Sequence, residues 1–171
     1  MEDYFEFDES GKVLEWVSEN CPSHVEIPNT VTEIGSYAFE GCTSLQSVEI
    51  PDSVTKIGDD VFSRCSSLPK ISVSRKSSCF VSVDGVLYDI EKTRLIQYPA
   101  GRDEKAFSIP DTVSEIGSSA FFGCSSLQSV EIPDSVTEIG NGAFAFCWSL
   151  QLVDIPDSVT KIGDYAFLLC I

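Results

Sequence analysis

The chain has 171 residues, enough for one domain that buries a substantial core. Hydrophobic residues make up 43% of it, so the sequence predicts a folded protein rather than a disordered one. The 27 acidic and 11 basic residues give a net charge of −16, which repels phosphate groups and disfavours nucleic acid or an anionic membrane surface as a partner.

The first predicted element is a hairpin within residues 1–24. Two segments, Tyr4–Phe7 and Val13–Trp16, flank a turn at Asp8–Gly11. This hairpin is expected to cover the open end of the first repeat, as a terminal cap does. Residues 1–4 lack the basic and apolar pattern of a secretory leader, and no stretch approaches the roughly 18 apolar residues of a membrane span. The sequence therefore predicts no membrane insertion, and a cytoplasmic protein if the chain is complete; a missing leader would place it at the cell surface or outside.

An internal repeat marked by the dipeptide Ile-Pro comes next. Its isoleucines are Ile27, Ile50, Ile109, Ile132 and Ile155. They are spaced by 23, 59, 23 and 23 residues, so the longer interval exceeds one period by 36 residues. A period of 23 lies within the roughly 20–29 residues of a leucine-rich repeat, which predicts a solenoid of stacked coils.

The positions within one repeat have separate structural roles. Leu127, Val130 and Ile132 form the apolar side of a short strand, and the residues between them face solvent. Pro133 ends the strand because it has no N–H to donate. The glycine that follows, Gly58 in an earlier repeat, either takes a positive φ or packs closely against the neighbouring coil.

A phenylalanine and a cysteine also recur once per repeat, and stacking should align each type along the core. The predicted phenylalanine spine is Phe39, Phe62, Phe121, Phe144 and Phe167. The predicted cysteine ladder is Cys42, Cys65, Cys124, Cys147 and Cys170. Stacked side chains point in parallel and buried cysteine behaves as a small hydrophobe, so the ladder is expected to be reduced. Cys21 and Cys79 lie outside it and are expected to be the more exposed thiols.

Residues 74–106 interrupt the regular period and predict a three-stranded meander. Phe80–Val83 alternates, Asp84-Gly85 is a hairpin turn signal, and Val86–Tyr88 returns, with Leu95–Tyr98 as the third strand. The segment is either a bulged coil or a protruding contact element, since insertions in solenoids often map to binding faces.

The repeated unit Val-Glu-Ile-Pro-Asp-Ser-Val-Thr-x-Ile-Gly-x-x-Ala-Phe-x-x-Cys-x-Ser-Leu resembles the BspA-like leucine-rich repeat family over residues 25–73 and 107–171. Residues 74–106 resemble a longer variant of that repeat. The resemblance implies a single curved leucine-rich-repeat solenoid, with strands lining the concave face and short strands, turns or 3-10 segments on the convex side, a β-rich α/β fold. It also implies adhesion or protein binding, and many members are surface proteins of bacteria and parasitic protists.

Residues for catalysis, cofactors and metals do not form the required patterns. His24 is the only histidine, and the chain has no Cys-x-x-Cys motif, nucleophile elbow or phosphate-binding loop. Carboxylates such as Glu131 and Asp134 recur in register, so they share like environments rather than the unlike ones of an acid–base pair. Weak calcium binding by these acids stays open. We therefore predict a protein that is not an enzyme and has no cofactor.

The candidate binding surface is the predicted concave face. It consists of His24, Glu26, Gln46, Ser47, Glu49, Lys70, Ser72, Ser108, Gln128, Ser129, Glu131, Gln151, Leu152 and Asp154. The leading prediction is a module that binds another protein through this face. The alternative is a structural spacer or assembly segment of a larger repeat protein, and an enzyme is a remote third possibility. The acidity serves either solubility or a cationic partner.

Apolar residues collect toward the C-terminus at positions that are polar or glycine in earlier repeats. They are Phe122, Phe146, Trp148, Leu168 and Leu169. Val153–Ile155 is the last predicted strand and would present an unpaired edge. We therefore predict that this end docks, either onto further repeats or onto another subunit.

Overall fold

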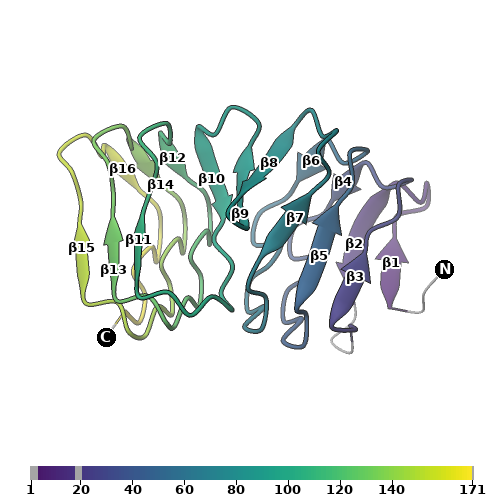
Figure 1. The fold of residues 1–171 in the computed structure, drawn as a ribbon, viewed down its shortest axis with the longest axis horizontal. Helices are drawn as coiled ribbons and strands as arrows, with labels where there is room; N and C mark the ends of the chain where they lie inside the picture. The colour runs from purple at the N-terminus through teal and green to yellow at the C-terminus, as the bar shows by residue number, and fades with distance from the viewer. Residues whose placement is uncertain (1–3, 18–20, 171) are drawn as a thin grey trace.

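The structure, a computed structural model, describes residues 4–17 and 21–170. They form a solenoid in which each 23-residue repeat makes one coil (Figure 1). Within the described residues every regular element is a β-strand. The predicted solenoid is confirmed. Of the predicted options for the side opposite the longer strands, the described residues form two-residue strands and turns, and no 3-10 or α-helical segment.

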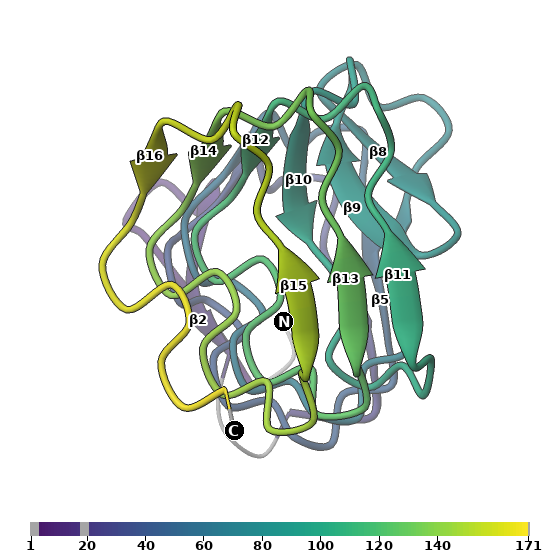
Figure 2. The same cartoon turned by 90° about the vertical axis from the view of Figure 1, so that its left-hand side faces the viewer.

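Each regular coil contributes two strands, one on each of two sides of the solenoid (Figure 2). The longer strands are β3 (His24–Glu26), β5 (Ser47–Ile50), β7 (Ile71–Val73), β11 (Ala106–Ser108), β13 (Ser129–Glu131) and β15 (Leu152–Asp154). The short return strands are β4 (Glu33–Ile34), β6 (Lys56–Ile57), β12 (Glu115–Ile116), β14 (Glu138–Ile139) and β16 (Lys161–Ile162). Most of the longer strands stop at the Ile-Pro dipeptide, because proline cannot donate to the next ladder hydrogen bond.

Neighbouring coils pair in parallel and in the register of the repeat. Val130 lies opposite Val153, and Ile116 lies opposite Ile139, each one 23-residue period apart along the sequence. Backbone bonds continue this ladder outside the strands, as where the Thr137 amide donates to the Ser114 carbonyl at 2.9 Å. Equivalent residues of the repeat therefore form rows along the solenoid.

The rows are interrupted at residues 74–106. There β8 (Phe80–Val83), β9 (Val86–Asp89) and β10 (Arg94–Gln97) form the predicted antiparallel meander, and β10 pairs in parallel with β12. The long strands consequently form two separate sheets, β3-β5-β7 and β11-β13-β15. The hairpin of β8 and β9 lies against β7, where the Ser82 hydroxyl donates to the Ile71 carbonyl at 2.6 Å. This segment is one coil with an inserted hairpin.

The phenylalanine spine lies in the core as predicted, in two runs. Phe39 stacks on Phe62 with ring centroids 5.2 Å apart. Tyr98 begins the second run and stacks on Phe121, which is followed by Phe144 and then by Phe167, a half-buried ring in the last described coil. The tyrosine in the spine was not predicted, because the variant repeat lacks the Ala-Phe pair that marks the position. Two hydrophobic clusters, one in each half of the solenoid, correspond to the two runs.

The N-terminal hairpin is confirmed as well. β1 (Phe5–Phe7) and β2 (Val13–Val17) are antiparallel, and β2 pairs in parallel with β4. Leu14 and Val17 are buried against the first coil. Positions 1–3 and 18–20 of the predicted cap segment, residues 1–24, lie outside the described residues.

Each coil turns with the help of two left-handed residues, which the sequence did not reveal. The first set is Tyr37, Asp60, Ser119, Gly142 and Tyr165, and the second set is Gly41, Arg64, Gly123, Phe146 and Leu169. The glycine after each return strand has the other predicted role, close packing. A Cβ on Gly140 would lie 2.5 Å from the Ser118 backbone nitrogen, which leaves no room for a side chain.

Candidate functional site

The predicted surface residues lie together on the outward faces of sheets β3-β5-β7 and β11-β13-β15, which we term the strand-lined face (Figure 1). One row contains His24, Ser47, Lys70, Ala106, Ser129 and Leu152. The second row contains Glu26, Glu49, Ser72, Ser108, Glu131 and Asp154. Gln46, Gln128 and Gln151 are exposed immediately before the strands. Ala106 was missed because the variant repeat hides the strand start.

The break between the two sheets divides this face into two parts that differ in charge. A groove of about 520 Å³ lies over β11, β13 and β15 and is lined by Glu131, Asp134 and Asp154, with no lysine or arginine. A groove of about 500 Å³ over the first sheet contains three acids as well, Glu26, Glu49 and Asp52, but also Lys76. The second half of the face is therefore the more negative of the two.

Hydrogen bonds on the face join neighbouring coils. The His24 ring Nδ1 lies 2.7 Å from the Ser47 hydroxyl, and the Ser108 hydroxyl donates to the Glu131 carboxylate at 2.9 Å. His24 is exposed on an open sheet rather than enclosed in a pocket. The serine–histidine contact thus orders a surface and lacks the shielded setting that nucleophilic catalysis uses.

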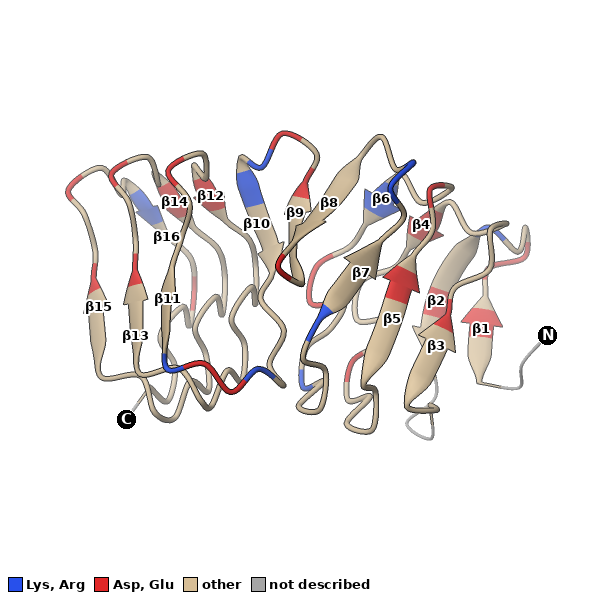
Figure 3. Cartoon of the chain, in the orientation of Figure 1, with Lys and Arg blue, Asp and Glu red and all other residues tan. Residues whose placement is uncertain are grey.

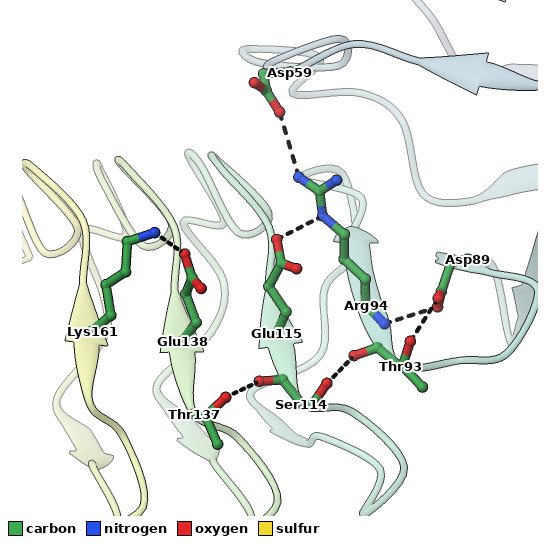
Figure 4. A network of polar contacts seen from close by, with 9 residues as sticks. All are labelled: Asp59, Asp89, Thr93, Arg94, Ser114, Glu115, Thr137, Glu138 and Lys161. Atoms are coloured by element: carbon green, nitrogen blue, oxygen red, sulfur yellow. Dashed lines mark hydrogen bonds and ion pairs between the residues drawn. The ribbon is translucent and has the colours of Figure 1, made fainter.

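Charges on the opposite side, along the short strands, are arranged differently (Figure 4). There Glu33 pairs with Lys56 at 3.6 Å, and Glu138 pairs with Lys161. Arg94 connects the two halves, since its guanidinium lies 2.9 Å from Glu115 and 3.5 Å from Asp59 on the other side of the break. This side therefore balances most of its acids with bases from neighbouring coils.

The strand-lined face has no such balance among its acids. Glu131 lies directly opposite Asp154, and Glu26 directly opposite Glu49. Figure 3 shows these acidic positions along β5, β13 and β15. None of the ion pairs within residues 4–17 and 21–170 involves any of these four carboxylates. Like charges in facing positions destabilise a sheet.

The cysteine ladder is reduced and mostly buried, with one correction. Cys21 is only 3% exposed and stacks beside Cys42, so it belongs to the ladder and the expected exposure was wrong. Its spacing of 21 residues from Cys42, instead of 23, concealed the match. The Cys65 thiol donates to the Phe39 carbonyl at 3.1 Å, and burial raises its pKa to about 12. Cys79 is half-buried.

The predicted C-terminal apolar residues lie along one lateral ridge of turns. Phe122 and Phe146 have ring centroids 5.0 Å apart, and Phe146 lies 5.8 Å from Trp148. Leu168 and Leu169 are exposed in the next coil along the same ridge. Phe122, Phe146 and Trp148 therefore form one cluster in the second half of the solenoid. This cluster extends beside the strand-lined face rather than over the end of the solenoid.

No group of three or more His, Cys, Asp or Glu residues converges in residues 4–17 and 21–170 to hold a metal ion. The same residues contain no helix that is long and apolar enough to cross a membrane.

Comparisons with known proteins agree with this architecture. The model of the BspA type leucine rich repeat region matches six copies over residues 18–95 and 101–171. A leucine-rich repeat protein from Eubacterium ventriosum is 35% identical, with a TM-score of 0.79, over 86% of this chain and 39% of its own. A leucine rich cell surface protein from Faecalibacterium prausnitzii is 38% identical, with a TM-score of 0.70, over 84% of this chain and 44% of its own.

The pneumococcal vaccine antigen PcpA, at 24% identity and a TM-score of 0.70, shares the fold over 82% of this chain and 46% of its own. No curated protein matches the chain. The chain spans less than half the length of these solved structures. With its repeats matched over most of its length, the chain belongs to the BspA-type leucine-rich-repeat family.

Proposed function

We propose that this chain is a non-enzymatic module that binds another protein through its strand-lined face. Proteins of this repeat family typically take part in protein interactions or lie at cell surfaces, and one similar structure is described as a cell surface protein. Adhesion through a surface-displayed face is consistent with both statements. The open, solvated sheet supports binding rather than catalysis.

The observation that carries the proposal is the row of unpaired acids on this face. The short-strand side of the same coils pairs acids with bases, so the fold has the means to neutralise its charges. Glu131 and Asp154 on the strand-lined face oppose each other directly, as Glu115 and Glu138 do on the short-strand side, but unlike those two glutamates they have no ion-pair partner among the described residues. Such an arrangement of like charges lowers stability, a cost that a ligand of opposite charge would relieve.

The partner segment is accordingly basic and extended. Lysine or arginine side chains would meet the carboxylates of Glu131, Asp134 and Asp154, and Leu152 supplies an apolar contact within the same groove. The net charge of −16 adds a long-range attraction for such a segment.

The test uses a peptide of alternating lysine and glycine, with a glutamate–glycine peptide as the charge control. The lysine peptide should bind saturably by calorimetry, and binding should weaken as salt is raised beyond about 0.15 M because surface charges are then screened. The double variant Glu131→Gln/Asp154→Asn should bind at least about tenfold less tightly. The matched control, Glu26→Gln/Glu49→Gln, should have a smaller effect because Lys76 already lies in that groove. The proposal would be refuted if the glutamate peptide bound as tightly as the lysine peptide, or if the variant Glu131→Gln/Asp154→Asn bound the lysine peptide as tightly as the unchanged chain does.

A second candidate function, assembly with further repeats or another subunit, is supported by the last described coil. Ile155 and Ile162 are 42% and 49% exposed, whereas Ile132 and Ile139 at the same positions one coil earlier are buried. Exposed apolar rows of this kind favour stacking of a further layer. Light scattering over a concentration series tests self-association, and a strictly monomeric protein whose mass is independent of concentration would exclude assembly with a second copy.

A further inference from the structure

The residue that precedes the ladder cysteine has a left-handed backbone in each regular coil. Gly41 and Gly123 occupy this position at φ 75° and 70°, as expected for a residue without a Cβ. Phe146 occupies it at φ 61°. A bulky residue rarely adopts this conformation, and the coil geometry is clearly compatible with glycine. The phenylalanine is therefore not required by the turn.

The Phe146 ring instead contributes to an aromatic surface. It lies between Phe122 and Trp148, at the centroid distances given above, and Trp148 is 50% exposed. The position of Trp148 holds Thr43 and Ser66 in earlier coils. Since those coils fold with polar residues, the aromatic residues of this ridge are a local departure from the repeat rather than a need of the core.

These side chains line a groove of about 290 Å³, which we term the aromatic groove. Its lining consists of Thr43, Arg64, Ser66, Ala100, Phe122, Gly123, Phe146 and Trp148. It thus joins both halves of the solenoid at the ridge of turns. An exposed, concave aromatic surface is typical of binding sites, and tryptophan and arginine are enriched among residues that dominate binding energy.

We propose that the aromatic groove is a second docking site, which receives a bulky apolar side chain from an extended, lysine- or arginine-bearing segment of a partner protein. This site is separate from the strand-lined face and does not depend on it. The groove volume of about 290 Å³ lies at the lower limit of the roughly 300–1,000 Å³ found for pockets of drug-sized ligands, which suits one or two side chains.

The chemistry of the lining selects this occupant. The only charged group in the lining is Arg64, which already lies 3.5 Å from Glu40 and 6.0 Å from the Phe122 ring centroid. Two hydroxyl groups, those of Thr43 and Ser66, are too few to satisfy a sugar or nucleotide, so the groove favours an apolar anchor. A second copy of the chain would bring another net charge of −16 and would be repelled. A basic segment is instead attracted by this charge. Exposed ring faces also attract lysine and arginine directly.

The experiment follows the fluorescence of Trp148 in the full chain with Trp16→Phe, which removes the other tryptophan. The probes are three short peptides: leucine flanked by lysines, leucine flanked by glutamates, and alanine flanked by lysines. The lysine–leucine peptide should shift the Trp148 emission saturably at concentrations up to about millimolar, and the other two should bind at least about tenfold less tightly.

Phe146→Gly separates a binding role from a structural one. Because glycine suits the left-handed turn, this variant should change the melting temperature by less than about 4 °C and yet weaken the lysine–leucine peptide at least about tenfold. The matched control is Tyr165→Gly, which removes an aromatic residue that is 74% exposed at φ 59°, outside the groove, and should leave peptide binding unchanged.

The double variant Glu131→Gln/Asp154→Asn distinguishes this site from the strand-lined face, because the lysine–leucine peptide should still shift Trp148 emission in that background. No saturable shift by this peptide, equal binding of the glutamate peptide, or equal binding to Phe146→Gly would each overturn the proposal. A loss of binding only in the double variant would assign the peptide to the strand-lined face and overturn it as well.

Discussion

Removal of one ring from the spine should be far more damaging than removal of its sequence neighbour. Phe121 is completely buried between Tyr98, at 5.2 Å, and Phe144, at 4.8 Å. Truncation of a buried phenylalanine to alanine costs about 3–5 kcal/mol, and each stacked ring pair contributes about 0.5–1.5 kcal/mol of favourable contact. With two stacked partners, Phe121→Ala should fall in the upper part of that range, at about 4–5 kcal/mol.

Urea denaturation followed by circular dichroism measures this loss, with Phe122→Ala as the control. Phe122 is the next residue but is only half-buried on the ridge of turns, so its truncation should cost about 1 kcal/mol. The slope of the transition should stay unchanged if both proteins unfold in one step. A loss below about 1 kcal/mol for Phe121→Ala, or equal losses for the two variants, would show that the stacked spine does not stabilise the solenoid.

Three further predictions concern the thiols, the coil packing and the break between the sheets. A thiol reagent at pH 8 should label only Cys79 and Cys170 in the native protein, because the other five cysteines are buried. After denaturation without reductant, mass spectrometry should count all seven cysteines as labelled, and fewer than seven would reveal disulfides. Gly140→Ala should lower the free energy of unfolding by about 1–3 kcal/mol because its Cβ would overlap the neighbouring coil, and an unchanged urea midpoint would contradict that packing. Arg94→Gln should cost less than about 1 kcal/mol and the loss should disappear in about 1 M salt, whereas a salt-independent loss would mean that packing rather than charge is involved.

Periodicity explains why so much of the fold could be predicted. A 23-residue repeat forces equivalent side chains into rows, so the strand at Ser129–Glu131 and the burial of Phe144 follow from the alignment alone. The surface rows were predictable for the same reason, because alternation along a strand decides which residues face solvent. In the irregular variant repeat the meander was predictable from its turn signal, but the positions of Tyr98 in the spine and Ala106 in the surface row were missed because no period marks them.

Other features depend on properties that the residue pattern does not contain. Left-handed backbone at Phe146 and Arg64 is imposed by stacking on neighbouring coils and contradicts the usual preference of both residue types. Cys21 entered the ladder through a coil that is two residues shorter. The grooves arise from side chains of several coils at once, and the balance of charge between the two sides of the solenoid depends on which residues face each other in space.

Position-specific photo-cross-linking in the intact chain can show whether a partner protein contacts the strand-lined face. A photoreactive side chain placed at Ser129 or Leu152 reports contacts of the strand-lined face, and one placed at Thr137 or Thr160 reports contacts of the short-strand side of the same coils. With proteins presented on a cell surface as partners, we expect one discrete cross-linked species from Ser129 or Leu152 and none from Thr137 or Thr160. The species should be lost in the background Glu131→Gln/Asp154→Asn. Equal cross-linking from both sides, or cross-linking that survives neutralisation of those carboxylates, would contradict the proposed binding face.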